Sequence, residues 1–167
     1  VTASGAFDSW EAADGAQVRS ADTGNLLLDL GVVERLGLRF DPRYGLTGGE
    51  DSLFTRQLTR AGGVIRFAAG AVVTKRVPAA RARRTWVLER SLRSGSSWAR
   101  VRIDTVGPAG DGASGRLARL RLRLGYGAKG LAKAGIDGAR AGVARIRGDV
   151  PAQARYEVSS RGGLGMV

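Results

Sequence analysis

The 167-residue chain contains no cysteine and no histidine. Without cysteine it has no disulfide, no thiolate nucleophile and no cysteine-based zinc site. Without histidine it has neither a Ser-His-Asp triad nor the usual proton shuttle at neutral pH. Acid–base chemistry must therefore come from carboxylates, lysine or tyrosine. No apolar run approaches the roughly 20 residues that a membrane-spanning helix needs.

The charge is divided unequally along the chain. Residues 1–74 carry 7 basic and 9 acidic residues, a net of −2, whereas residues 75–167 carry 20 basic and 6 acidic residues, a net of +14. This division indicates a catalytic or binding fold whose C-terminal part faces phosphate, in a nucleotide, a nucleic acid or an anionic membrane. The chain starts without methionine and stops in a Gly-rich segment, so we expect it to be a piece of a longer protein.

The first half has the pattern of a mixed α/β fold. The apolar run 25–30 predicts a buried strand, and residues 32–36 predict one or two helical turns. Residues 50–61 place apolar side chains on one face of a longer helix, and glycines follow both helices as stop signals. Two further short strands are expected at 64–67 and 71–74.

The sequence Gly48-Gly49-Glu50-Asp51 stands where the longer helix is predicted to begin. Two glycines leave room for a ligand beside adjacent carboxylates, which is how a general base could be presented. The alternative is an acidic helix start that only complements the positive end of the helix dipole.

Residues 83–103 are expected to form one helix with two different sides. At about 100° per residue, Trp86 shares an arc about 100° wide with four arginines, and apolar residues lie opposite. The arginines are Arg83, Arg90, Arg93 and Arg100, and the apolar residues are Leu88, Leu92, Ala99 and Ile103. The basic side is either a solvated face with Trp86 as a packing residue or a surface for phosphate or a membrane.

The C-terminal part is predicted to be a basic helical extension. Residues 107–115 have the composition of a linker, residues 116–124 alternate arginine and leucine, and residues 128–147 are amphipathic. The apolar side of this last stretch would hold Ala128, Leu131, Ile136, Ala139, Val143 and Ile146. Such helices lie on anionic membranes or pack on their own domain with a solvated basic side. Residues 125–130 match the GxGxxG spacing of phosphate loops, but no strand or βαβ unit surrounds them, so we interpret the match as chance.

Four elements in order resemble the C-terminal half of family 2 glycosyltransferases, over approximately residues 21–103. They are Thr23-Gly24-Asn25 with the three leucines that follow, the run Gly37 to Gly45, the run Thr47 to Asp51, and Arg60-Ala61-Gly62 before a short strand pair. The resemblance is to bacterial members that build exopolysaccharides or cell-envelope glycans. It implies a GT-A fold, here its C-terminal portion with a basic helical extension. It also implies inverting transfer of a sugar from a nucleotide-diphosphate sugar to a hydroxyl of a glycan or lipid-linked acceptor.

The resemblance also implies roles for individual residues. Asp51 matches the catalytic aspartate that takes the acceptor proton, Glu50 is its usual neighbour, and Gly48 and Gly49 let the acceptor approach. Thr23, Gly24 and Asn25 match the start of a strand that lines the donor and acceptor cleft. Arg84, Trp86 and Arg90 occupy the region of a QxxRW-like element that holds the diphosphate, although this chain lacks the glutamine and has Thr85 before the tryptophan.

A division into three parts follows from the resemblance. Residues 1–106 would be the acceptor-side half of the transferase domain, 107–115 the linker and 116–167 the extension. A divalent metal, Mg²⁺ or Mn²⁺, is expected in the full-length enzyme through an Asp-x-Asp motif, which this chain does not contain.

The fragment is therefore expected to be inactive alone, and the protein to work in the cytoplasm at the inner face of the membrane. The alternatives are a basic nucleic-acid-binding protein, for which no recognised motif is present, and a non-enzymatic membrane-surface protein.

Overall fold

A computed structural model describes residues 2–8, 11–106 and 112–167. The chain forms two compact units. We call residues 9–75 the sheet unit, and residues 1–8 with 76–167 the helical unit. This grouping places the helix that follows residue 83 with the C-terminal helices, whereas the sequence-based boundaries assign it to the first domain.

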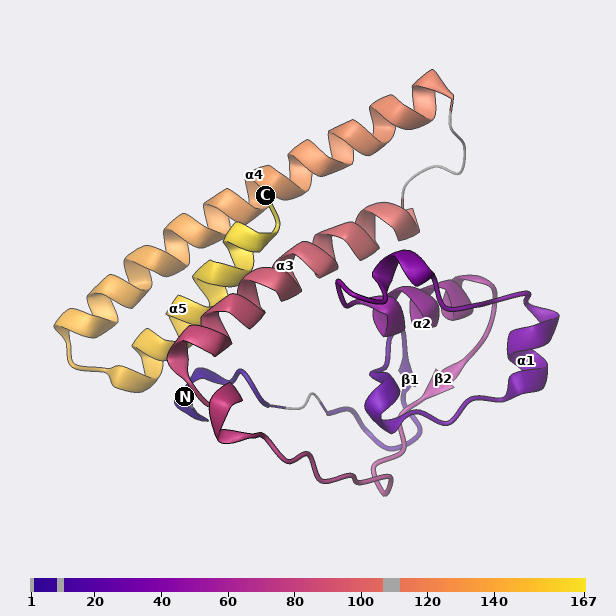
Figure 1. The fold of residues 1–167 in the computed structure, drawn as a ribbon, viewed down its shortest axis with the longest axis horizontal. Coiled ribbons are helices and arrows are strands. Elements are labelled where there is room, and N and C mark those ends of the chain that lie inside the picture. Colours follow the sequence, from indigo (N-terminus) through magenta and orange to yellow (C-terminus); the bar gives the residue numbers. More distant parts are fainter. Residues whose placement is uncertain (1, 9–10, 107–111) are drawn as a thin grey trace. The chain divides into compact units, whose positions relative to one another are not determined.

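In its described residues, the sheet unit contains two short strands, two α-helices and two 3-10 turns (Figure 1). β1 (Gln17–Val18) pairs antiparallel with β2 (Ile65–Arg66), with Val18 opposite Ile65. The helices are α1 (Leu30–Arg35) and α2 (Glu50–Arg60). The predicted short helix, the longer helix and the strand at 64–67 are therefore confirmed.

The core of the sheet unit lies under α2. Leu53, Phe54 and Leu58 of this helix are buried, together with Tyr44 and with Ile65 of β2. The ring of Phe40 stacks on that of Phe54, with ring centroids 4.3 Å apart. Burying these large side chains is the main stabilisation of so small a unit, at roughly 1.5–3 kcal/mol for each.

Two predicted strands of the sheet unit are wrong. The run 25–30 begins in a 3-10 turn and reaches α1 without forming a strand, and Leu27 is 98% exposed. Residues 71–74 are also outside any strand and exposed. An apolar run forms a buried strand only beside a hydrogen-bonding partner, and within the described residues β1 and β2 pair only with each other. The two segments meet instead through the Asn25 side-chain amide, which donates to the Ala71 carbonyl at 2.6 Å.

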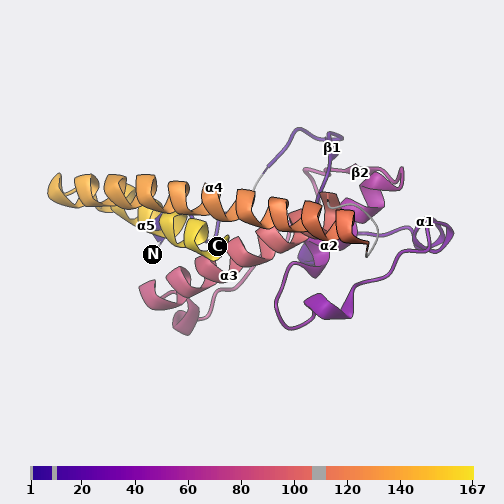
Figure 2. The same ribbon diagram turned by 90° about the horizontal axis from the view of Figure 1, so that it is seen from above.

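The helical unit consists mainly of α3 (Arg84–Val106), α4 (Ala113–Ile146) and α5 (Val150–Gly165). α5 packs along both of the other helices, which have little contact with each other. Figures 1 and 2 show α5, in yellow, alongside the N-terminal part of α3 and the C-terminal part of α4. α5 is therefore the element that holds the helical unit together.

Glycines let these helices approach closely. A Cβ atom on Gly95 of α3 would collide with the carbonyl oxygen of Gly162 in α5. A Cβ on Gly130 of α4 would lie 2.5 Å from the carbonyl oxygen of Gly163. Both crossings thus require glycine, because any side chain would push the backbones apart.

α4 differs from its prediction in two ways. The predicted linker is only partly testable, since 107–111 lie outside the described residues, but 113–115 already belong to the helix. The helix then runs unbroken through the GxGxxG match at 125–130, which confirms that this match is not a phosphate loop.

The prediction of which side of α4 is buried is wrong. Leu131, Ile136, Val143 and Ile146 are exposed, while Gly130, Ala134, Asp137, Ala141 and Ala144 are buried. These buried residues follow alternating spacings of four and three, the period of a helix seam. Small residues on this seam allow α5 to come close, and the larger apolar residues point away from it.

α3 confirms the expectation of one continuous helix. Ala99 and Ile103 are buried as predicted, whereas Leu92 is exposed. Val87 and Val101 are buried although the sequence interpretation did not assign them to the core.

Candidate functional site

The N-terminus of α2 is formed by two glycines in a left-handed conformation. Gly48 has φ of +78° and Gly49, the N-cap residue, has φ of +95°. Residues with a Cβ rarely adopt this region, so the turn depends on glycine. It places Glu50 and Asp51 in the first helical turn, as the sequence predicted.

Asp51 lines an open pocket of about 550 Å³ within the sheet unit. The lining residues come from the segment that follows β1 and from the first turn of α2. They are Val18, Arg19, Ser20, Ala21, Asp22, Asp51 and Ser52. The pocket therefore brings a helix-borne carboxylate next to backbone and hydroxyl groups that could receive a polar ligand.

A buried threonine holds the two sides of the pocket together. The Thr55 hydroxyl donates to the Asp51 carbonyl at 2.7 Å and accepts from the backbone N–H of Ala21 at 3.3 Å. Its oxygen is also 3.3 Å from the Ser20 hydroxyl. Thr55 is fully buried, so these contacts are shielded from water. Sequence reasoning missed Thr55. Its position four residues after Asp51 on the same helix could have indicated a hydrogen bond from its hydroxyl to the Asp51 carbonyl.

The two adjacent carboxylates have different surroundings. One oxygen of Asp51 accepts from the Ser52 backbone N–H at 2.6 Å, and its side chain is half-buried at the pocket. Glu50 does not line the pocket, and its Oε2 atom is buried without a hydrogen-bond partner among the described residues. Asp51 is thus the carboxylate that a pocket ligand can reach.

Thr23, Gly24 and Asn25 lie beside the pocket in sequence but do not line it. They form an exposed 3-10 turn, which the Asp22 carboxylate caps by accepting from the Gly24 N–H at 2.8 Å. The expected strand start is absent here. Ser20 to Asp22, just before it, contribute to the pocket instead.

Arg84, Trp86 and Arg90 lie in the helical unit, at the start of α3. The Arg84 guanidinium forms an ion pair with Glu157 of α5 at 3.0 Å. The Trp86 ring stacks on Phe7, and the guanidinium carbons of Arg81 and Arg90 lie 5.7 and 5.5 Å from its centroid. Trp86 is therefore held by one aromatic ring and two cations. Each exposed cation–π contact contributes about 0.5–1 kcal/mol of stabilisation.

The described residues do not fit a divalent metal site on their own. They contain no group of three or more carboxylates that could share an ion. Asp22 and Asp51 both line the pocket, but the Asp22 carboxylate already caps the 3-10 turn. None of the helices in the described ranges combines the length and apolar character that crossing a bilayer requires.

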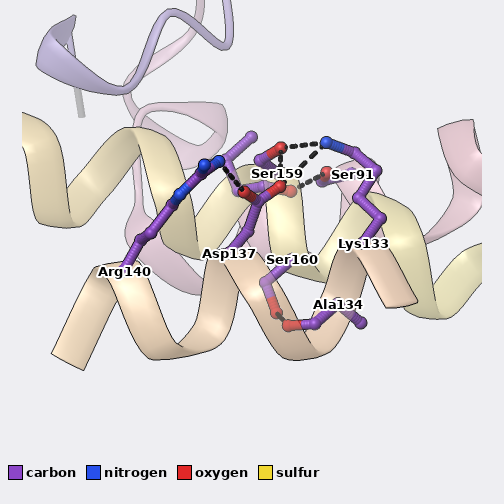
Figure 3. Close-up of polar contacts among 8 residues, drawn as sticks. Ser91, Lys133, Ala134, Asp137, Arg140, Ser159 and Ser160 are labelled. Atoms are coloured by element: carbon purple, nitrogen blue, oxygen red, sulfur yellow. Dashed lines mark hydrogen bonds and ion pairs between the residues drawn. The ribbon is translucent and has the colours of Figure 1, made fainter. Parts of the chain in front are cut away.

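A second polar cluster lies between α4 and α5 (Figure 3). The buried Asp137 carboxylate accepts from the Ser159 hydroxyl at 2.6 Å, from Lys133 at 2.9 Å and from Arg140 at 3.4 Å. The Ser159 hydrogen bond and then Lys133 hold the pKa of Asp137 below its ordinary value of 3.8, although burial opposes this. Because its partners are side chains of these two helices, we interpret the cluster as a helix-to-helix connection.

The comparisons with known proteins give one partial relative. Over 85 residues the sequence is 38% identical to the succinoglycan biosynthesis protein ExoM of Rhizobium meliloti (strain 1021). The matched region is 51% of this chain and 28% of that relative, so the chain spans less than a third of its length. No family model matches the chain, and no solved structure matches it.

Proposed function

We propose that the sheet unit carries the catalytic base of an inverting glycosyltransferase of exopolysaccharide biosynthesis. The observation that carries the proposal is the Asp51 carboxylate on an open pocket, at a helix start that two glycines form. The partial similarity to a succinoglycan biosynthesis protein supports the same class of pathway. The resemblance of residues 21–103 to family 2 glycosyltransferases supports the reaction type.

In the proposed reaction, the acceptor hydroxyl binds in the pocket and gives its proton to the Asp51 carboxylate. The acceptor oxygen forms a bond to the anomeric carbon of the sugar, on the face opposite the leaving group. The bond from that carbon to the diphosphate breaks, and the nucleoside diphosphate leaves with the electron pair. A carboxylate can act as this base, and the chain offers no histidine for the role.

The remaining parts of the proposal concern the whole protein. We place the nucleotide-binding half, with a GT-A fold and a metal-binding motif, in protein sequence outside this chain, and the protein at the cytoplasmic face of the membrane. Arg84, Trp86 and Arg90 stay candidates for holding the diphosphate. Of the two arginines, Arg90 suits that role better, since Arg84 already pairs with Glu157.

The experiment is Asp51→Asn in the full-length natural protein. Loss of the base should lower kcat by roughly 10²- to 10⁴-fold while donor binding and folding persist. Asp22→Asn is the matched control, because this second carboxylate lines the same pocket but caps a turn. It should lower kcat by less than about tenfold. An Asp51→Asn enzyme that turns over as fast as the Asp22→Asn control would assign the base to another residue.

A further inference from the structure

Four leucines form an exposed stripe along α4, from Leu117 to Leu131. Leu117, Leu120, Leu124 and Leu131 are 50%, 51%, 65% and 56% exposed. Their spacings of three, four and seven residues place them within an arc of about 60° at 100° per residue. We call these four residues the leucine stripe. It lies away from the seam of small residues that faces α5, so the packing of the helical unit leaves it uncovered.

Basic residues accompany the leucine stripe, and acidic residues are absent from this part of the sequence. Residues 112–136 contain six cations and no carboxylate. The cations are Arg116, Arg119, Arg121, Arg123, Lys129 and Lys133. On the helix, Arg116 and Arg123 fall on one side of the stripe and Arg121 on the other, so positive charge flanks the leucines on both sides.

We infer that the leucine stripe binds the surface of an anionic lipid membrane, with α4 lying parallel to it. Leucines in a narrow stripe can enter the boundary between headgroups and acyl chains, and the flanking guanidinium groups can reach the lipid phosphates. Four to eight cations on an amphipathic helix are typical of anionic-lipid recognition. The surface contact requires no membrane-spanning helix.

The charge argues against other occupants of this face. A second copy packed stripe to stripe would bring the flanking arginines Arg116, Arg121 and Arg123 against their equivalents, which repel at the distances of a helix pair. Nucleic acid would satisfy the cations but leave the four leucines in water. Of these three occupants, the anionic lipid surface is the one that matches both the apolar and the basic parts. The inference deepens the membrane placement in the proposed function, but it does not depend on Asp51, since its evidence comes wholly from the helical unit.

The test is binding of the complete 167-residue chain to vesicles of phosphatidylglycerol and phosphatidylcholine. Leu117→Gln with Leu120→Gln and Leu124→Gln should weaken binding by about a hundredfold or more, since each leucine loses its apolar burial. The matched control replaces three exposed apolar residues of the sheet unit, Leu27→Gln, Leu46→Gln and Val72→Gln. It should bind as the unaltered chain does, and circular dichroism should show unchanged helix content in both variants.

The electrostatic part has its own pair of variants. Arg121→Gln with Arg123→Gln should weaken binding to anionic vesicles about 25-fold, because each cation near such a surface contributes about a fivefold affinity. Arg35→Gln with Arg39→Gln, in the sheet unit, is the control of equal charge and should have little effect. Equal binding to pure phosphatidylcholine vesicles, or equal losses in the two arginine pairs, would overturn the assignment to anionic lipid.

A unique label can locate the contact, because the chain contains no cysteine. An environment-sensitive fluorophore on Leu124→Cys should shift to shorter wavelength when anionic vesicles are added. The same fluorophore on Ile136→Cys should not, although Ile136 is exposed on the same helix, since it lies about 130° round from the stripe. Equal shifts at both positions would overturn the proposed orientation. Tighter binding to a DNA duplex that the triple leucine variant leaves unchanged would assign the face to nucleic acid.

Discussion

The two units of this chain differ completely in charge. The sheet unit holds 8 basic and 8 acidic residues, so it is neutral overall. The helical unit holds 19 basic and 7 acidic residues, which accounts for the whole net charge of +12. The pocket with its carboxylate lies in the neutral unit, and the exposed basic and apolar helix face lies in the charged one. The proposed chemistry and the proposed attachment to a membrane surface therefore fall in different parts of the chain.

The units also differ in how they are packed. The sheet unit buries large side chains such as Tyr44, Leu53 and Phe54, whereas the helical unit buries mostly valine, alanine and glycine. A core of large residues depends on apolar area, but close helix crossings depend on the absence of side chains. Adding a single methyl group should therefore do more damage in the helical unit than its size suggests.

Gly95→Ala tests this packing difference and should have the largest effect on stability. The new Cβ would meet the Gly162 backbone, so α3 and α5 must separate. We expect a loss of about 3 kcal/mol, at the upper end of the range for overpacking. Gly135→Ala is the matched control, because nothing lies within 4 Å of a Cβ there, and it should stabilise the helix by about 0.5–1 kcal/mol.

Hydrogen exchange can show where the Gly95→Ala effect occurs. Amides of α3 and α5 should exchange faster, while those of α2 should keep their protection. Equal acceleration in both units would contradict the division of the chain into two independently packed parts.

Asp137→Asn should have the next largest effect. The buried carboxylate accepts hydrogen bonds from Ser159, Lys133 and Arg140, and its side chain is only 8% exposed. A neutral amide cannot accept from all three, so we expect a loss of about 2 kcal/mol in chemical unfolding. Glu89→Gln, on the exposed surface of α3, should change stability by less than about 0.5 kcal/mol.

Acid should remove the effect of Asp137→Asn. Because folding lowers the pKa of Asp137, the charged carboxylate stabilises the fold above its ordinary pKa of 3.8. That contribution is lost as the pH falls from this value through the lower pKa of the folded state. The difference in unfolding free energy between the two proteins should therefore shrink below about pH 4. A difference that persists unchanged well below about pH 4 would show that Asp137 acts through shape and not through charge.

The helices could be predicted from the sequence because their signals are local. Apolar periodicity and the glycines that follow defined α2, and the alternation of sides along residues 83–103 defined α3. The position of Asp51 at a helix start followed from Gly48 and Gly49 in the same way. These features depend on residues within a few positions of each other.

Features that depend on distant residues could not be predicted. The runs 25–30 and 71–74 have strand composition, but a strand also needs a partner, and composition does not supply one. The prediction of the buried side of α4 was wrong, because a hydrophobic pattern favours leucine and isoleucine, whereas close contact with α5 requires glycine and alanine. The Ser20–Thr55 contact spans 35 residues, so no local pattern could indicate it.

Thr55→Val should have the smallest effect and the most specific one. Valine keeps the shape of the buried side chain but removes the hydroxyl that accepts from the Ala21 N–H and donates to the Asp51 carbonyl. We expect the free energy of unfolding to fall by about 1 kcal/mol, the net value of a typical hydrogen bond. The matched control is Thr85→Val, which replaces an exposed threonine of α3 and should have little effect. In the full-length protein KM for the acceptor should rise more than kcat falls, because the variant loosens the pocket wall and leaves the Asp51 carboxylate in place. A loss of kcat as large as that of Asp51→Asn would instead mean that Thr55 positions the catalytic carboxylate itself.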